Sequence, residues 1–212
     1  MTGIGYLKLY YFDLGTRGKG ENIKLLLQDA GVPHEYVRIK QADWPTIKPQ
    51  LQEKGNVAGC LPAVETETGK FYTGTIPTMR TLSRKLGKYM PSDDEQQHVA
   101  DLVADLSLDW FNTFFDIFHG KITLDEHHKT VMPKHITRVE QIYGENEGPY
   151  LLGSEICYAD FLIFHILWDE NLRHQAEYPN LRKMQQAIES RPNLKDYLAS
   201  LPAEKSLSDL FK

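Results

Sequence analysis

The feature that most constrains the fold is a strand–helix–strand pattern near the start of the chain. Residues 6–12 are rich in aromatic and apolar side chains, and residues 34–39 contain Tyr, Val and Ile, so both segments predict strands. Between them, residues 21–30 place apolar side chains on one helical face, and Gly31 and Pro33 supply a stop. A strand, a helix and a strand within about 35 residues predict a βαβ unit with two parallel strands.

A hairpin and another helix follow the βαβ unit. Residues 63–67 and 71–73 are short strand patterns joined by a glycine-containing turn, which predicts an antiparallel hairpin. A helix is expected next, with Thr75 as its cap and Gly87 at its end. The order βαβ–ββα therefore accounts for residues 1–87.

A proline stands at the start of the first hairpin strand, in the pair Leu61–Pro62. Proline cannot donate to a strand ladder, so it belongs at the first residue of a strand or on an edge. X–Pro bonds also supply nearly all cis peptides, which occur in tight turns. A cis bond would turn the backbone N–H and C=O of Leu61 outward, ready to pair with an extended peptide. From these residues alone, an ordinary trans proline is favoured.

The character of the chain changes after a polar, proline-containing segment at residues 88–94. Every later periodic pattern is helical, including a long helix expected over 124–143. Residues 159–172 are apolar nearly all round, which predicts a buried central helix. We therefore predict an α/β domain at 1–87, a linker at 88–94 and an all-α domain at 95–212.

Composition argues against several functional classes. A net charge of −5 and a pI of about 5.9 do not suggest nucleic acid or an anionic membrane surface as a partner. The N-terminus has no apolar signal segment, and no run of about 18 apolar residues is present, so no membrane span is expected. Two distant cysteines, Cys60 and Cys157, favour a reducing, cytoplasmic setting.

Two other features lack the pattern of a ligand site. The loop at residues 13–20 contains three glycines, but their spacing does not fit GxGxxG. His127 and His128 are adjacent on a predicted helix, so they cannot both face one metal ion. Together with His119 and His135 they are expected at the surface, and no metal site is predicted.

The order of these elements and five short motifs resemble the cytosolic glutathione transferases. Residues 11–21 resemble the first strand and loop of the tyrosine-type classes, and residues 41–48 are similar to the sigma class, which includes prostaglandin D synthases and S-crystallins. Leu61–Pro62 falls where the family has a cis-proline, and residues 178–181 and 190–198 resemble its C-terminal segments. The resemblance covers essentially the whole chain. It implies a thioredoxin-like domain, an all-helical domain, a cis Leu61–Pro62 bond and glutathione as co-substrate.

The resemblance implies that Tyr11 is the catalytic residue. Glutathione reacts as its thiolate, but a free thiol has a pKa of about 8.5 and is mostly protonated at neutral pH. A hydroxyl donor aimed at the sulfur stabilises the anion. Tyr10 is expected to point to the opposite side, because strand side chains alternate. Lys19 stands where the family often has an arginine whose charge favours the thiolate, in a loop longer than the family's.

Other glutathione-binding residues are implied in the same way. Trp44, through its indole N–H, and Lys48 are expected to bind the glycyl carboxylate. Their i, i+4 spacing lets both face one ligand if this stretch is helical. The backbone of Leu61, held by Pro62, is expected to pair with the cysteinyl residue like an added β-strand.

The γ-glutamyl carboxylate is expected at the start of the helix that follows the hairpin. The family has a Gln-Ser pair there, and this chain has Gly74-Thr75. Thr75 keeps the hydroxyl, and a helix N-terminus favours an anion. Gly74 removes a side-chain amide, which is expected to weaken binding by one hydrogen bond, or about 1 kcal/mol.

The helical domain is expected to complete the site. Asp101, Asp105 and Asp109 lie four apart on one helical face, and the resemblance implies that Asp109 reaches the γ-glutamyl amine across a dimer interface. A solvated acidic face is the alternative. The residues assigned to the electrophile pocket are Leu14, Trp110, Phe115 and His119, and packing of the aromatic side chains in the core is the alternative.

One family motif is altered in a way that bears on folding. Cys157 and Asp160 stand where the family carries a Ser/Thr-x-x-Asp capping box for its central helix. Cysteine is a poorer cap acceptor than serine, so the box is expected to be half kept.

These assignments predict a homodimeric glutathione transferase that acts on small apolar electrophiles, with isomerase or peroxidase side activity possible within the class. A non-catalytic relative like the S-crystallins is the alternative, which Gly74 and the altered loop favour. Redox chemistry at Cys60 is disfavoured because no CxxC is present.

Overall fold

The computed structural model describes residues 4–201, and these divide into two compact units. The first unit contains the described residues up to Lys88 together with 192–201, and the second contains Tyr89–Arg191. The sequence boundary at 88–94 falls at this division, but the segment 192–201 packs with the first unit, although it was expected to belong to the helical domain. Asn193 Nδ2 donates to the Asp29 carbonyl at 2.8 Å and thereby attaches this segment to the first unit.

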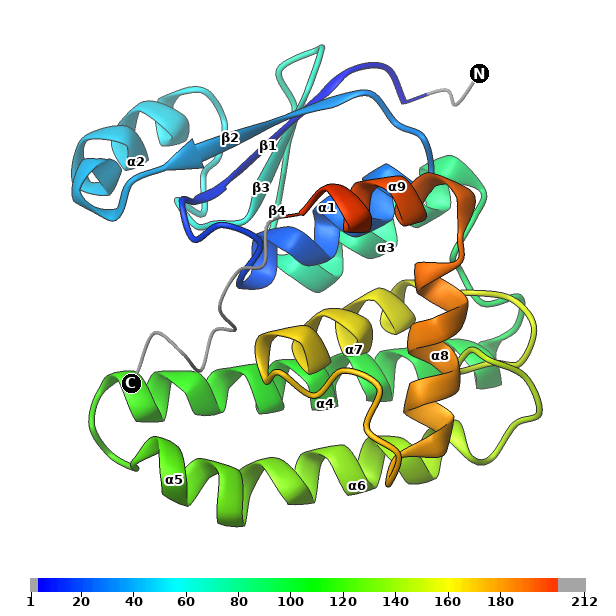
Figure 1. The fold of residues 1–212 in the computed structure, drawn as a ribbon. Coiled ribbons are helices and arrows are strands. Elements are labelled where there is room, and N and C mark those ends of the chain that lie inside the picture. Colours follow the sequence, from blue (N-terminus) through cyan, green and yellow to red (C-terminus); the bar gives the residue numbers. More distant parts are fainter. Residues whose placement is uncertain (1–3, 202–212) are drawn as a thin grey trace. The chain divides into compact units, whose positions relative to one another are not determined.

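The first unit is a four-stranded mixed sheet with helices, as the βαβ–ββα pattern predicts (Figure 1). The strand order is β2-β1-β3-β4, with β1 and β2 parallel and the other neighbours antiparallel. Helices α1, α3 and α9 lie together beside the sheet. The elements are β1 Leu7–Phe12, α1 Lys19–Asp29, β2 His34–Ile39, α2 Trp44–Glu53, β3 Ala63–Thr66, β4 Phe71–Thr73, α3 Thr75–Leu86 and α9 Pro192–Ser200.

Two local expectations in the first unit have different outcomes. The Leu61–Pro62 bond is cis, as the resemblance implies and contrary to the expectation from the local residues alone. Thr75 is not the cap of α3: the helix begins at Thr75, and Gly74 occupies the cap position without a side-chain bond. The chain enters this helix through glycine at φ 81°, so the capping geometry depends on the backbone of Gly74.

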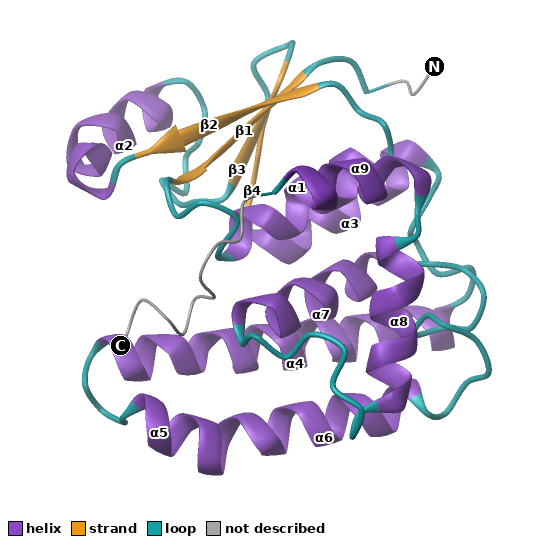
Figure 2. Ribbon diagram, viewed as in Figure 1, coloured by secondary structure: helices purple, strands orange, loops and turns teal. Residues whose placement is uncertain are grey.

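The described part of the second unit consists of helices and their connections (Figure 2). The central helix is buried over nearly all of its length, as its continuous apolar pattern predicts. No helix of the described residues is long and apolar enough to cross a membrane. The elements are α4 Asp94–Phe118, α5 Leu124–Glu126, a π-helical turn His127–Val131, α6 Met132–Tyr143, α7 Tyr158–Asp169 and α8 Pro179–Glu189.

A buried carboxylate organises the start of α7. Asp160 Oδ2 accepts the Cys157 N–H at 2.8 Å, and the Cys157 side chain accepts the Asp160 backbone N–H, so both halves of the capping box are present and the expectation of a half-kept box is wrong. Asp160 Oδ1 also accepts the Leu151 N–H and the Tyr143 hydroxyl, each at 2.9 Å. Burial raises the pKa of Asp160, although these donors oppose the rise. One side chain therefore connects α6, the loop before α7 and α7 itself.

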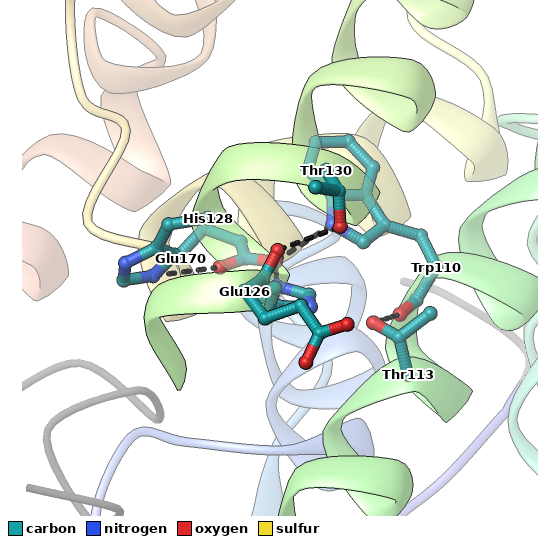
Figure 3. Close-up of polar contacts among 7 residues, drawn as sticks. Trp110, Thr113, Glu126, His128, Thr130 and Glu170 are labelled. Atoms are coloured by element: carbon teal, nitrogen blue, oxygen red, sulfur yellow. Dashed lines mark hydrogen bonds and ion pairs between the residues drawn. The ribbon is translucent and has the colours of Figure 1, made fainter. Parts of the chain in front are cut away.

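The expectation of four surface histidines is wrong for His127, whose side chain is fully buried. His127 Nε2 lies 2.7 Å from Glu170 Oε1. The half-exposed His128 Nε2 lies 3.8 Å from Glu170 Oε2, and Figure 3 shows His128 beside Glu170. The long predicted helix 124–143 is interrupted here by the π-helical turn, whose i→i+5 bonding alters the register of the side chains. Two adjacent histidines of the π-helical turn therefore lie near the carboxylate of Glu170, the residue that follows α7.

Candidate active site

Three neighbouring strands bring the predicted residues to one end of the sheet. Tyr10 pairs with Ala63, and Ala63 pairs with Thr73. The residues next in register, Tyr11, Pro62 and Gly74, therefore follow at the same end, and the Gly74 N–H donates to the Pro62 carbonyl at 3.1 Å. Trp44 follows β2, which runs parallel to β1, so it belongs to this end as well.

Tyr11 and Tyr10 point to opposite faces of the sheet, as strand alternation predicts. The Tyr11 hydroxyl accepts the backbone N–H of Lys19, at the start of α1, at 3.0 Å. Tyr10 instead donates to Glu65 Oε2 at 2.6 Å and packs with the apolar residues beneath α2. Burial, followed by the Glu65 hydrogen bond, raises the pKa of Tyr10. Of the two tyrosines, only Tyr11 forms a hydrogen bond with the first residue of α1.

Lys19 meets Tyr11 through its backbone. The Lys19 side chain is half-buried, and burial lowers the pKa of its ammonium group. Because burial disfavours a charged form, this environment opposes the charge that the family's arginine carries. The role expected for the Lys19 ammonium therefore stays a prediction, while the backbone contact is a feature that sequence reasoning missed.

Trp44 and Lys48 lie on one helix, so the geometric condition for their shared ligand is met. Trp44 is partly buried and packs edge-on against Phe12, with ring centroids 5.6 Å apart. Phe12 in turn lies 5.9 Å from the Tyr11 ring, so it connects the two predicted residues. Sequence reasoning did not single out Phe12; its position directly after Tyr11 was the only available signal.

The loop before the cis-proline lies beneath α2. A Cβ on Gly59 would come within 2.8 Å of Lys48 Cε, so the lysine stem covers this loop. Leu61 packs on the same apolar cluster as Trp44. Asn56 Nδ2 donates to the carbonyl of Cys60 at 3.1 Å and thereby stabilises the loop. Lys48, Trp44 and Leu61 are thus neighbours in space, which the sequence motifs alone did not establish.

Gly74 has a backbone that favours glycine, with φ 81° and ψ 144°. A Cβ there would meet only Pro77 atoms at 3.6 and 3.7 Å, so space is available and the strain is in the backbone. The absence of a side-chain amide at position 74 predicts the loss of one hydrogen bond to the ligand. The structure adds that glycine also avoids about 1–3 kcal/mol of strain at this position.

We therefore expect Gly74→Gln to lower the free energy of unfolding by about 1–3 kcal/mol, because its backbone is strained. Gly74→Ala carries the same strain without the amide and is the matched control. Glutathione affinity of the Gln variant should exceed that of the Ala variant by up to about tenfold, the equivalent of roughly 1.4 kcal/mol. Calorimetric titration measures the ratio, and equal affinities would show that the amide does not reach the ligand.

The acidic residues of α4 do not share one environment. Asp101 is partly buried and accepts a hydrogen bond from the Tyr158 hydroxyl of α7. Asp105 and Asp109 are exposed. The expected common acidic face therefore holds for two of the three, and the glutathione contact assigned to Asp109 stays a prediction.

The residues assigned to the electrophile pocket also differ in burial. Trp110 is fully buried, and its indole N–H donates to Glu170 Oε1 at 2.7 Å, so it belongs to the core of the second unit and its pocket assignment is wrong. Phe115 is 49% exposed, and His119 is exposed just beyond the end of α4. Leu14 is partly buried in the loop after β1. Five residues along a helix place Trp110 and Phe115 on different faces.

A pocket of about 360 Å³ lies at the opposite end of β1 from Tyr11. Its lining includes Leu7 and Tyr72, with the ammonium groups of Lys70 and Lys85 at 5.4 and 6.0 Å from the Tyr72 ring. None of the predicted glutathione residues lines it. Within the described residues, no group of three or more His, Cys, Asp or Glu side chains is arranged to hold a metal ion.

Comparison with known proteins matches residues 104–201 to the family model described as Glutathione S-transferase, C-terminal domain. The chain is 28% identical over 208 residues to "Glutathione S-transferase P 10" of Caenorhabditis elegans, with 93% of each chain covered. The solved structure of a Nu-class enzyme of this type from Haemonchus contortus has a TM-score of 0.77 and 27% identity, covering 94% of this chain and 98% of that chain. A monomeric protein from Necator americanus, Na-GST-3, has the same fold with a TM-score of 0.76, 21% identity and coverage of 94% and 99%. These relatives carry different class names, so similarity to the sigma class stays a prediction.

Proposed function

We propose that this chain, which is similar to glutathione S-transferases over nearly its whole length, is a glutathione transferase that conjugates the thiolate of glutathione to small apolar electrophiles, with Tyr11 as the thiolate-stabilising donor. The observation that carries the proposal is the position of the Tyr11 hydroxyl. It lies at the carboxyl end of β1 against the first N–H of α1, at the sheet end that also presents the cis Leu61–Pro62 peptide.

The chemistry that we propose for Tyr11 follows from its hydrogen bond. A tyrosine hydroxyl can accept and donate at once, so the N–H of Lys19 does not use the hydroxyl proton. Donation of that proton to the glutathione sulfur stabilises the thiolate over the thiol. The thiol proton leaves to solvent and the sulfur lone pair forms the S–C bond. The electrophile then either loses its leaving group with the bonding electron pair, or its double bond opens and the far atom takes up a proton from solvent.

The remaining first-unit residues are proposed to hold the peptide part of glutathione. Trp44 and Lys48 would bind the glycyl carboxylate, since they share α2 and lie beside the loop before Leu61. The Leu61 backbone would pair with the cysteinyl residue. The start of α3, with Gly74 and Thr75, would receive the γ-glutamyl carboxylate, because helix N-termini favour anions.

The purified chain tests this proposal directly. Calorimetric titration should give a Kd for glutathione below about 1 mM. With glutathione present, the protein should also release chloride from an aromatic chloride, one ion for each conjugate formed. Binding without turnover across several classes of electrophile would favour the non-catalytic alternative. No binding at millimolar glutathione would overturn the proposal as a whole.

We also propose that the chain forms a homodimer, in which Asp109 would reach the glutathione of the partner subunit. The exposure of Asp105 and Asp109 on α4 is compatible with an interface there. Because one relative with this fold is described as monomeric, light scattering decides the question. A monomer at micromolar concentration would contradict both the dimer and the role of Asp109.

A further inference from the structure

We propose that the backbone N–H of Lys19, held against Tyr11 by glycines on both sides, is the group that positions and polarises the Tyr11 hydroxyl, and that the Lys19 side chain is secondary. This inference rests on the proposed glutathione transferase function. It replaces the expected side-chain cation with a main-chain donor.

The geometry begins with the contact itself. Lys19 is the first residue of α1, and its N–H donates to the Tyr11 hydroxyl at 3.0 Å. The first N–H groups of a helix have no partner within the helix, and the helix dipole gives this end a partial positive charge. A donor on the phenolic oxygen withdraws electron density from the O–H bond, so the hydroxyl becomes a stronger donor to a sulfur anion.

The flanking glycines explain how the helix start can lie so close to the ring. A Cβ on Gly18 would come within 2.8 Å of the Tyr11 hydroxyl oxygen, and φ is +79° there. A Cβ on Gly20 would lie 2.5 Å from Tyr11 Cγ and 2.4 Å from the Tyr36 hydroxyl oxygen. Carbon atoms do not pack at such distances, so any side chain at position 20 displaces Tyr11, Tyr36 or the helix.

Other elements of the first unit hold the helix start in place. Arg38 of β2 donates to the Gly15 carbonyl in the loop before α1, and its guanidinium lies 4.4 Å from the centre of the Tyr36 ring. On the other side, Tyr197 of α9 donates to Glu21 in the first turn of α1. Contacts from β2 and α9 therefore hold the loop and the first turn of α1 in the position that brings the Lys19 N–H to the Tyr11 hydroxyl.

Two substitutions of Lys19 distinguish the contribution of its backbone N–H from that of its side chain. Lys19→Pro removes the N–H, and proline is tolerated at the first position of a helix because that N–H has no helical partner. Lys19→Ala keeps the N–H and removes only the charge. We expect kcat to fall about tenfold or more in Lys19→Pro and by at most about threefold in Lys19→Ala.

The ultraviolet signal of the bound thiolate is the second readout. The pKa of the bound glutathione thiol should rise in Lys19→Pro and change little in Lys19→Ala, while the Kd for glutathione stays within about twofold in both. Equal effects of the two substitutions, or a larger effect of Lys19→Ala, would overturn the inference. An inactive wild-type chain would instead overturn the proposed function.

Gly20→Ala provides an independent test, including the case in which Lys19→Pro does not fold. We expect it to raise the thiol pKa, although alanine is the better helix former. Tyr36→Phe combined with Gly20→Ala removes the hydroxyl nearest to the added methyl group. Full recovery in the double variant would show that only Tyr36 was displaced and would overturn the role of Gly20; persistent loss supports it.

Discussion

Tyr11→Phe is expected to raise the pKa of the bound glutathione thiol and to lower kcat by roughly 10- to 100-fold. The substitution removes one hydrogen bond to an ionised sulfur, which is worth about 1.5–3 kcal/mol. Glutathione affinity should change little, because the ring that packs against Phe12 is retained. Ultraviolet titration of the bound thiolate measures the pKa, and steady-state conjugation kinetics measure kcat.

Tyr10→Phe is the matched control for this experiment. It removes a neighbouring hydroxyl that also bonds a partner, the Glu65 carboxylate, but on the other face of the sheet. We expect this variant to lose stability and to keep the thiol pKa. An unchanged thiol pKa in Tyr11→Phe, or the same rise in Tyr10→Phe, would contradict the assignment of Tyr11.

Asp160→Ala is expected to have the largest effect on stability, lowering the free energy of unfolding by about 3–5 kcal/mol. It leaves the N–H groups of Leu151 and Cys157 and the Tyr143 hydroxyl buried without their acceptor. Each buried donor without a partner costs about 1–3 kcal/mol, and neighbouring effects are less than additive. For a chain of this length the melting temperature should fall by roughly 6–20 °C.

Asp105→Ala serves as the control, because Asp105 is exposed on α4 and its substitution should stay within about 0.5 kcal/mol. Asp160→Asn keeps one acceptor oxygen and should lie between the two. Denaturant unfolding of all three variants tests this ranking. A loss below about 1 kcal/mol in Asp160→Ala would show that the loop before α7 rearranges to satisfy its own donors.

Local patterns were sufficient for most of the first unit. The strands at 7–12 and 34–39, the helix between them and the later hairpin follow from side-chain periodicity, which is a property of neighbouring residues. The opposite orientations of Tyr10 and Tyr11 also follow from strand alternation. The cis state of Leu61–Pro62 did not follow from its own residues and required the resemblance to a family.

Positive φ values were a second limit of local reasoning. The sequence predicts only that Gly74 lacks the amide of the family's Gln. The structure adds that φ is 81° at this position, a conformation that favours glycine. The glycines of the 13–20 loop likewise formed no motif, because their role depends on how closely Tyr11 and Tyr36 approach them.

The sequence by itself determined the order of the elements and predicted a change of character at residues 88–94, and the resemblance to a family added the candidate catalytic tyrosine. Tertiary structure alone decided that Trp110 and His127 meet at Glu170 inside the helical unit, and that the backbone of Lys19 meets Tyr11. The physical reason is the range of each interaction. Periodicity assigns a side chain to a face of its own helix or strand, but the polar partner on that face comes from a segment 43 or 60 residues away, and only the packed fold brings the two together.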